Sequence, residues 1–283
     1  MTRSINRRTF LGTSAAVGAA MMLPGRASHA ADRKKYGGFR MGIQSYSLRG
    51  FKVERAIEIS QELGMAHMEF YGAHFSTGSN EAACGAMKKK MAARGMAMLG
   101  HGVNGFSKNH EANRKLFQFA KWAGIKNLSA DPTEDAFDSL DKLCAEFDIR
   151  IAIHNHGPGS RYDRVVDVLN AVKDRHKNIG ACADLGHYIR SAEDPVKVIH
   201  LLKGRLFGIH LKDFADQKKR TKGVILGKGF LDVPATFKAL REVGFPEDGC
   251  LSLEYEESPK DPVAEIKECL EVAAAGARKS AKR

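Results

Sequence analysis

Four short stretches of this 283-residue chain place ionisable side chains at the end of an apolar run. The stretches are Ile-His-Asn-His at 153–156, Ala-Asp-Leu-Gly-His at 183–187, Ile-His-Leu-Lys-Asp at 209–213 and Leu-Glu-Tyr-Glu at 253–256. Imidazole nitrogens and carboxylate oxygens together suit Mn²⁺, Co²⁺, Fe²⁺ or Zn²⁺, and the histidines make Mg²⁺ a poorer match. The residue types therefore predict one divalent metal ion as a cofactor.

The alternation of side chains along these stretches indicates which residues would meet, because successive side chains of a strand point to opposite faces. One face takes bulky side chains, namely Ile151, Ile153, Phe207, Ile209, Leu211, Leu251, Leu253 and Tyr255. The other face is small or polar and ends in His154, Asp184, His210 and Glu254. If the stretches are neighbouring parallel strands, about 4.8 Å apart, these four residues converge and are the predicted metal ligands. A single histidine or aspartate at a strand end is more often structural, so the prediction depends on all four together.

Other polar residues near the strand ends are candidates for catalysis and substrate binding. Glu254 is the predicted base, and His187 and Lys212 are predicted to act beside it. Lys212 could hold negative charge on a substrate oxygen, or it could pair with Asp213 or a neighbouring acid. The predicted substrate contacts are Glu69, His101 and His156, although a structural strand-end histidine explains His101 equally well.

The rest of the sequence alternates strand-like and helix-like segments. Strands are expected at 41–46, 67–71, 96–101, 126–130, 150–154, 179–184, 206–211 and 250–254. Helices are expected at 53–63, 81–94, 111–123, 134–147, 162–175, 194–202, 234–243 and 262–275. Eight strand–helix units with no second domain's worth of sequence left over predict a single α/β domain, a (β/α)8 TIM barrel, over residues 40–276. A doubly wound open sheet is the weaker alternative, because no glycine-rich phosphate turn follows the first strand.

The N-terminus has the features of an export signal. The paired arginines Arg7 and Arg8 precede a mildly apolar run from Thr13 to Leu23, as in a twin-arginine signal. The run is too short and too rich in Ala and Gly to be a membrane span, and an uncleaved anchor is the alternative. We expect a signal peptide at 1–30, cleavage before Ala31, a linker at 31–39, a basic tail at 277–283 and a periplasmic or secreted mature protein.

The charge of the chain is concentrated at its ends. Four arginines within residues 1–30 and four basic residues in the tail account for eight of the formal +12, which leaves +4 for the domain. This modest charge does not favour a nucleic-acid partner. The five cysteines form no C-x-x-C pair and are interpreted as buried free thiols, since an odd number cannot all pair within one chain.

One long connection, from Asp213 to Asp232, carries the basic run Lys218-Lys219-Arg220-Thr221-Lys222. In a barrel this loop lies on the face where such folds keep their active sites. It could recognise an anionic or sugar ligand, cap the barrel mouth, or be an ordinary solvated loop.

The motifs I-H-N-H-G, D-L-G-H, I-H-L-K-D and L-S-L-E-Y-E resemble those of the xylose-isomerase-like sugar phosphate isomerase/epimerase superfamily, over nearly the whole chain after the signal. The resemblance implies that Asp184, His210 and Glu254 are metal ligands and that His187 contacts the substrate. His154 stands where ketose epimerases of this type commonly carry a glutamate, which puts proton exchange between two glutamates in doubt. Gly227-Lys228-Gly229 replaces the family's Gly-Glu-Gly.

The resemblance and the residue types imply the same chemistry. A divalent ion that binds a carbonyl and the adjacent hydroxyl stabilises the enediolate formed when a neighbouring C–H loses its proton. Return of the proton gives epimerisation or isomerisation, and loss of a β-substituent gives elimination. We therefore predict a metal-dependent isomerase or epimerase acting on a sugar, and export makes a non-phosphorylated sugar the expected substrate.

Other functions are open at this stage. They are a lyase that eliminates the aglycone from 3-keto-glycosides, and a metal-bearing carbohydrate-binding protein without turnover. Phosphodiester cleavage, which also occurs on this barrel, is disfavoured by the domain charge and by export. The substrate, the metal, the stereochemical outcome and the oligomeric state are left undetermined by the sequence.

Overall fold

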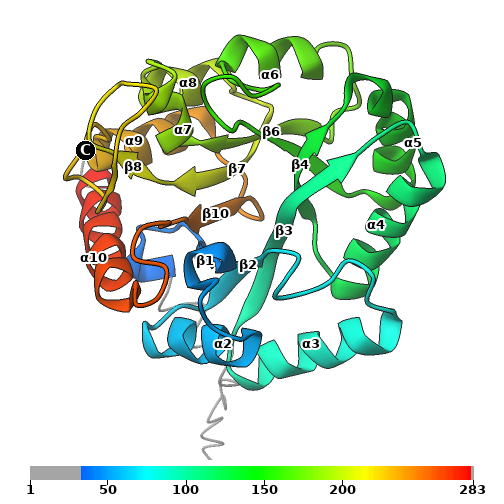
Figure 1. Ribbon diagram of the computed structural model, residues 1–283, viewed down its shortest axis with the longest axis horizontal. Helices are drawn as coiled ribbons and strands as arrows, with labels where there is room; N and C mark the ends of the chain where they lie inside the picture. Colours follow the sequence, from blue (N-terminus) through cyan, green and yellow to red (C-terminus); the bar gives the residue numbers. More distant parts are fainter. Residues whose placement is uncertain (1–32, 282–283) are drawn as a thin grey trace, which may run out of the picture.

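The computed structural model describes residues 33–281, which form a closed barrel of eight parallel strands. Around the barrel the strands follow the order β1-β10-β7-β6-β5-β4-β3-β2, so each strand pairs with its neighbours in the sequence (Figure 1). The barrel strands are β1 (Met41–Gln44), β2 (His67–Phe70), β3 (Ala97–Phe106), β4 (Asn127–Pro132), β5 (Arg150–His154), β6 (Ile179–Asp184), β7 (Leu206–Leu211) and β10 (Cys250–Leu253). The predicted (β/α)8 barrel is confirmed.

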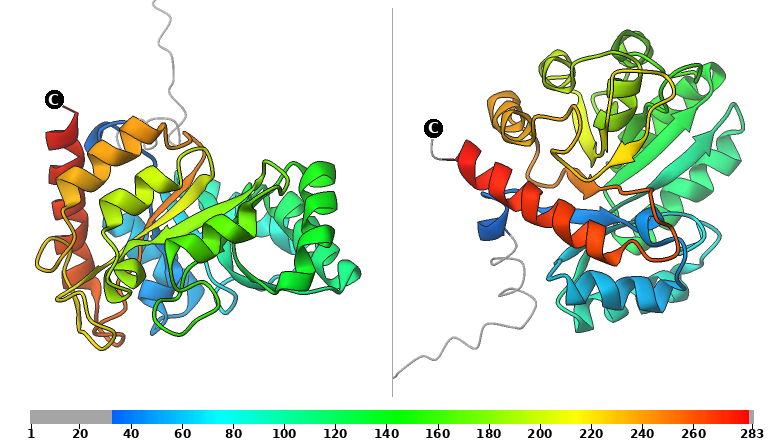
Figure 2. Two further views of the ribbon diagram at one scale, coloured as in Figure 1. Left: turned by 90° about the horizontal axis from the view of Figure 1, so that it is seen from above. Right: turned by 60° about the vertical axis from the view of Figure 1, so that its left-hand side comes forward.

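Helices cover the outside of this ring, as two further views show (Figure 2). They are α2 (Val53–Glu62), α3 (Glu81–Ala93), α4 (His110–Ala123), α5 (Phe137–Phe147), α6 (Val165–Val172), α7 (Leu185–Arg190), α8 (Pro195–Leu201), α9 (Val233–Val243) and α10 (Val263–Ser280), with 3-10 turns at Ser45–Leu48 and Glu134–Ala136. Polar caps begin several of them: the side chains of Asn80, Asn109 and Asp232 accept hydrogen bonds from backbone N–H groups of the first turn. Gly124 ends α4 and Gly244 ends α9 in the left-handed conformation that glycine adopts readily.

The large hydrophobic core lies between the strands and these helices. Ile151, Ile153, Ile209 and Leu251 face it and are fully buried, as the alternation predicts. The inner face has small residues: a Cβ added to Gly208 would lie 2.8 Å from Cys182 Sγ. Small side chains there leave room at the end of the strands for polar ones.

Phe207 corrects the predicted alternation. It was assigned to the outer face, but it packs against Ala152 and Cys182, which face inward. The pairing of β6 with β7 shifts here, since Ala181 pairs with Leu206 whereas Cys182 pairs with Gly208. Phe207 is the extra residue of this bulge, which changes the direction of its side chain.

Several boundaries differ from the prediction. The structure adds α7 directly after β6, and a hairpin of β8 (Asp213–Phe214) and β9 (Gly223–Val224) within the long connection. The last helix runs to Ser280, past the predicted domain end, and Tyr36 of the predicted linker is fully buried. The predicted signal peptide at 1–30 and the last two residues of the tail lie outside the described residues. No helix within residues 33–281 is long and apolar enough to cross a membrane.

Candidate metal centre

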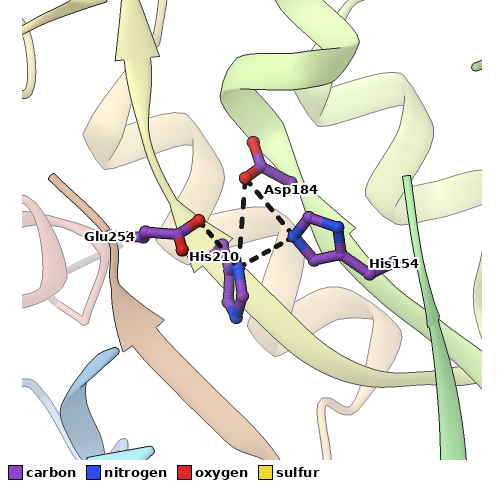
Figure 3. A group of neighbouring side chains, drawn as sticks. All are labelled: His154, Asp184, His210 and Glu254. Carbon is purple, nitrogen blue, oxygen red and sulfur yellow. Dashed lines mark hydrogen bonds and ion pairs between the residues drawn. The ribbon is translucent and has the colours of Figure 1, made fainter. Parts of the chain in front are cut away.

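Four side chains meet at the carboxyl ends of neighbouring strands. His154 ends β5, Asp184 ends β6, His210 lies in β7 and Glu254 directly follows β10. One candidate ligand atom from each lies within 4.8 Å of all the others, and all four residues are buried. Figure 3 shows the four side chains pointing toward one another. The predicted convergence of these residues is thus present.

Several distances among the four atoms match those between ligands of a single ion. His154 Nε2 lies 3.0 Å from His210 Nδ1 and 3.6 Å from Asp184 Oδ2, and His210 Nδ1 lies 3.1 Å from Glu254 Oε2. Atoms bound about 2.1 Å from one divalent ion are separated by roughly 3 to 4 Å. Asp184 Oδ2 is buried and receives no hydrogen bond of good geometry from the described residues. The cluster is therefore consistent with a divalent metal site.

A second carboxylate orients His210 from inside the barrel. Glu69, at the end of β2, places Oε2 3.0 Å from His210 Nε2, and it also accepts hydrogen bonds from Ser129 and Cys250. Burial alone would raise the pKa of Glu69, but the charge and hydrogen bond of His210 and the hydroxyl of Ser129 lower it to about 2. An ionised Glu69 accepts a hydrogen bond from the Nε2–H of His210, so Nδ1 faces the cluster as a ligand should.

Local structure also fixes Asp184. The Asn155 side chain accepts a hydrogen bond from Asp184 N at 2.8 Å and donates one to Asp184 O at 3.0 Å. Asp184 is at the same time the N-cap of α7, where Oδ1 accepts a hydrogen bond from His187 N at 2.8 Å. One carboxylate oxygen is thereby used by the helix, and Oδ2 is left for the cluster.

Lys212 brings a buried positive charge to the carboxylates of the cluster. Its Nζ lies 2.9 Å from Asp184 Oδ2, 2.7 Å from Glu254 Oε2 and 2.8 Å from Glu256 Oε1. Burial would lower the pKa of Lys212, but the three carboxylates raise it well above its usual value. The same ion pair, together with His210, holds the pKa of Glu254 well below its usual range despite burial. Of the two roles considered for Lys212, the structure shows ion pairing, and the partners are these carboxylates rather than Asp213.

Two histidines next to the cluster are neutral at physiological pH. Burial lowers the pKa of His187 to about 3, with Lys212 and His154 adding to the effect. Burial and the charge of His154 lower the pKa of His156 to about 4. Neutral imidazoles can both donate and accept hydrogen bonds, which suits contact with sugar hydroxyls.

A pocket of ≈ 450 Å³ opens over the cluster. Its polar wall contains His154, His156, His187, Glu254 and Glu256. The opposite wall is formed by Tyr46, Tyr71, Gly72, Gly102 and Val103. Edge-to-face contact between the rings of Tyr46 and Tyr71, with centroids 5.3 Å apart, holds the two aromatic side chains together.

Two predicted substrate contacts are not in this pocket. Glu69 is fully buried beneath the cluster, where it bonds to His210. His101 is 1% exposed, and its ring nitrogens lie 2.8 Å from Phe75 O and 3.1 Å from Asn104 Oδ1. Glu69 lies inside the barrel, whereas the His101 ring packs against Phe75 and Phe119 and so faces the helical layer outside β3. His156 and His187 do line the pocket, and their contact with substrate remains a prediction.

The sequence did not identify three residues at the site. Glu256 lies on the same face of its stretch as Glu254 and pairs with Lys212, so the alternation of side chains already contained the signal for it. Arg190 lies one helical turn after His187, and its Nη1 is 3.3 Å from His187 Nδ1. It was missed because α7 was not predicted. Tyr46 belongs to a turn that had been assigned to the first strand.

Two parts of the chain match models of known protein families. Residues 52–275 match the family model described as xylose isomerase-like TIM barrel. Residues 4–24 match the model of the twin-arginine translocation pathway signal sequence. The second match indicates export, which confirms that prediction, although the cleavage position remains untested.

Curated relatives are similar to part of the chain. An inosose dehydratase of Clostridium botulinum (strain Eklund 17B / Type B) is 29% identical over 138 residues, which are 43% of this chain and 45% of that protein. A 3-oxo-isoapionate decarboxylase of Pectobacterium atrosepticum is 29% identical over 120 residues, which are 39% of this chain and 42% of that protein. The chain spans about half the length of the curated relatives it matches.

Solved structures are similar over most of the chain. An uncharacterized protein from Parabacteroides distasonis has a TM-score of 0.64 and 30% identity, and the match covers 82% of this chain and 97% of that chain. The 3-keto-D-glucoside 4-epimerase from E. coli has a TM-score of 0.65 at 15% identity, covering 84% of this chain and 99% of that chain. At that identity the epimerase shows a shared fold alone.

Proposed function

Because this chain belongs to the xylose isomerase-like TIM barrel family, we propose that it is a divalent-metal-dependent isomerase or epimerase that removes a proton next to the carbonyl of a sugar or sugar derivative. The observation that carries the proposal is the convergence of His154, Asp184, His210 and Glu254 beneath an open pocket. Export supports a substrate that is not phosphorylated.

His154 Nε2, Asp184 Oδ2, His210 Nδ1 and Glu254 Oε2 are the atoms that would hold the ion. Two nitrogen and two oxygen ligands favour Mn²⁺, Co²⁺, Fe²⁺ or Zn²⁺ over Mg²⁺. Bound there, such an ion supplies Lewis acidity toward a carbonyl oxygen and so acidifies the neighbouring C–H.

Glu254 is the proposed base. It lines the pocket while most of its surface is buried, and its depressed pKa keeps it ionised and able to accept a proton at physiological pH. Lys212 Nζ, 2.7 Å from Glu254 Oε2, orients this carboxylate and compensates its charge. His156 and His187, both neutral, are proposed to hydrogen-bond the substrate hydroxyls. Tyr46 and Tyr71 offer a wall for the apolar face of a sugar ring.

The pocket also favours a second candidate, a lyase that eliminates a β-substituent, such as the aglycone of a 3-keto-glycoside. Among the described residues, the carboxylates that line this pocket are Glu254 and Glu256, and both follow β10. Epimerisation by two carboxylates needs one on each face of the substrate. This site lacks the second one, because β5 ends in His154. Elimination needs only one base and a donor for the leaving group. The similarity to a dehydratase and a decarboxylase supports this candidate.

One experiment tests the proposal and separates the candidates. The metal-loaded protein is incubated in D2O with a free ketose and, separately, with a 3-keto-glycoside, and both reactions are followed by NMR. Deuterium incorporation without cleavage is the result expected of an isomerase or epimerase. Release of the aglycone supports the lyase. Binding without either reaction overturns the enzymatic proposal in favour of a carbohydrate-binding protein.

Glu254→Gln identifies the base in the same assay. At equal metal content, which is measured because Glu254 is also a proposed ligand, removal of a general base lowers the rate by about 10²- to 10⁴-fold, and sugar binding should persist. Glu247→Gln is the control, because Glu247 pairs with Arg33 and is 83% exposed. Equal rates for the Glu254→Gln variant and its parent exclude Glu254 as the base.

A further inference from the structure

A second recess, of ≈ 550 Å³, adjoins the metal cluster beneath the β8–β9 hairpin. Lys212, Glu254 and Glu256 line this recess, and Lys212 forms an ion pair with Glu254 at the cluster. Glu254 and Glu256 also line the pocket over the cluster. The two hollows therefore meet at the same two carboxylates. A molecule whose reacting end lies at the cluster can extend into either of them.

Four cationic side chains line this recess without a carboxylate partner. Arg190 comes from α7, and Lys219, Arg220 and Lys222 come from the hairpin. No ion pair joins any of these four to an acidic residue within residues 33–281. Other lysines of the same connection are paired: Lys218 Nζ lies 3.3 Å from Asp216, and Lys228 Nζ lies 2.6 Å from Glu268.

The acidic residues of the recess are mostly engaged elsewhere. Lys212 pairs with Glu254 and Glu256. The Asp213 carboxylate accepts backbone hydrogen bonds from Gly227 at 2.9 Å, Gly229 at 3.0 Å and Leu231 at 2.9 Å. Asp213 and Glu257 are thus the two lining carboxylates that form no ion pair in the described part of the chain, against four unpaired cations. The unpaired charge of the recess is therefore positive.

The fold holds the cationic hairpin in place. Asp213 and Phe214 pair antiparallel with Gly223 and Val224, and Ala215 N donates to Lys222 O at 3.0 Å. The three hydrogen bonds to Asp213 fix the following Gly227-Lys228-Gly229 segment, where a Cβ on Gly229 would lie 2.2 Å from Phe214 O.

Arg190 joins the hairpin to the site. Its Nε donates to Lys219 O at 3.3 Å, and its guanidinium lies 5.4 Å from the centre of the Phe214 ring. Figure 1 shows the yellow connection that contains β8 beside α7. The cations are thus presented by an anchored structure next to the reacting groups.

We propose that this recess binds an anionic group carried by the substrate at the end remote from its carbonyl, and we expect a carboxylate because export supports a substrate that is not phosphorylated. This rests on the proposed function and adds the substrate class to it: an acidic sugar derivative. Arginine and lysine side chains that have no carboxylate partner break no ion pair when they bind an anion, and charge-assisted hydrogen bonds to carboxylate or phosphate are among the stronger polar contacts.

Calorimetric titration of the metal-loaded protein tests the proposal. The probes are D-glucuronate, D-glucose 6-phosphate, inorganic phosphate and, as the neutral reference, D-glucose. The altered protein is Lys219→Ala/Lys222→Ala, and its matched control is Lys218→Ala/Lys228→Ala, which removes the same charge from the same connection but outside the recess. We expect the anionic probes to bind the parent, with a loss of about tenfold or more in the first variant and less than about twofold in the control.

The relative affinities for glucuronate and for the two phosphates identify which anion the recess prefers. An equal loss in both double variants overturns the proposal, because it would show a general effect of charge. The proposal is also overturned if the parent and the Lys219→Ala/Lys222→Ala variant bind every anionic probe with equal affinity. Absence of binding to the parent overturns it as well.

Failure of this proposal can be told from failure of the proposed function. Anion binding that depends on Lys219 and Lys222 supports the recess even if the protein exchanges no substrate proton with D2O. Proton exchange with no dependence on these lysines overturns the recess and leaves the enzymatic function standing.

Discussion

Both halves of the barrel carry ionisable side chains near their strand ends, but only the half from β5 to β10 exposes histidines and carboxylates to the pocket over the cluster. From β5 to β10, His154 and Glu254 line the opening over the cluster. From β1 to β4, Glu69 and His101 are buried and bonded within the interior. His210 joins the two halves, because Glu254 lies at its Nδ1 and Glu69 at its Nε2.

The comparison of Glu254 with Glu69 shows that residue type does not decide the role of a carboxylate here. Both side chains are ionised, and both contact the same imidazole. Glu69 also binds a hydroxyl and a thiol and has no exposed surface, so it can orient His210 but cannot reach a substrate. Glu254 pairs with Lys212 and lines the pocket, so it can do chemistry. Changes in the half from β5 to β10 should therefore affect metal binding and turnover most. Changes in the half from β1 to β4 should act through His210.

The largest effect on stability is expected from Lys212→Met in protein freed of metal with a chelator. The change leaves Asp184 and Glu254 as buried carboxylates without their cation, which typically costs about 3–5 kcal/mol. Denaturant unfolding measures this loss, and added metal should restore more stability to the variant than to the parent. Lys228→Met is the control: its surface pair with Glu268 is worth about 1 kcal/mol or less. If the free energy of unfolding falls no more than in the control, Lys212 does not stabilise the buried carboxylates.

Asp184→Asn should weaken metal binding by roughly 100-fold or more, since it neutralises a proposed ligand. Metal content by mass spectrometry and calorimetric titration with Mn²⁺ and Zn²⁺ give the affinity. Asp248→Asn serves as the control, because Asp248 pairs with Arg150 at the start of β5 and so lies at the other end of the strand. Undiminished metal binding by the Asp184 variant would remove this residue from the ligand set.

Glu69→Gln should have a smaller effect on metal affinity, about 10- to 100-fold, because it alters the partner of a proposed ligand and not the ligand itself. The same titrations measure it. The comparison between the halves predicts that Glu69→Gln weakens metal binding less than Asp184→Asn does. The reverse order would mean that Glu69 itself binds the ion.

The smallest expected effect is the dependence of stability on acid pH through Glu69. Its pKa in the folded protein, about 2, lies below the ordinary value of 4.5, so it stabilises the fold above pH 4.5 and this contribution is lost as the pH falls toward 2. The loss attributable to Glu69 reaches about 1 kcal/mol by pH 4. Unfolding curves of metal-free parent and Glu69→Gln from pH 7 to pH 3 should converge as the pH falls. Parallel curves would contradict the low pKa.

The sequence predicted most of the barrel because alternating side chains and helix-ending residues are recognised within short stretches of the chain. The strands of a parallel barrel follow the order of the chain, so the predicted strands also gave their neighbours. The sequence missed α7, whose six residues contain no full apolar period, and it missed the β8–β9 hairpin, whose strands have two residues each. Phe207 was placed on the wrong face because a bulge in β7 interrupts the alternation.

What the sequence determined by itself was the barrel, the export signal and the four residues that converge, since alternation and strand order are properties of neighbouring residues. What only the tertiary structure decided was the set of partners around them: Glu69 behind His210, Lys212 among three carboxylates, and Arg190 with the hairpin cations beside the site. Those contacts depend on how strands far apart in the chain are tilted and shifted across the closed barrel. No local pattern of residues records that geometry.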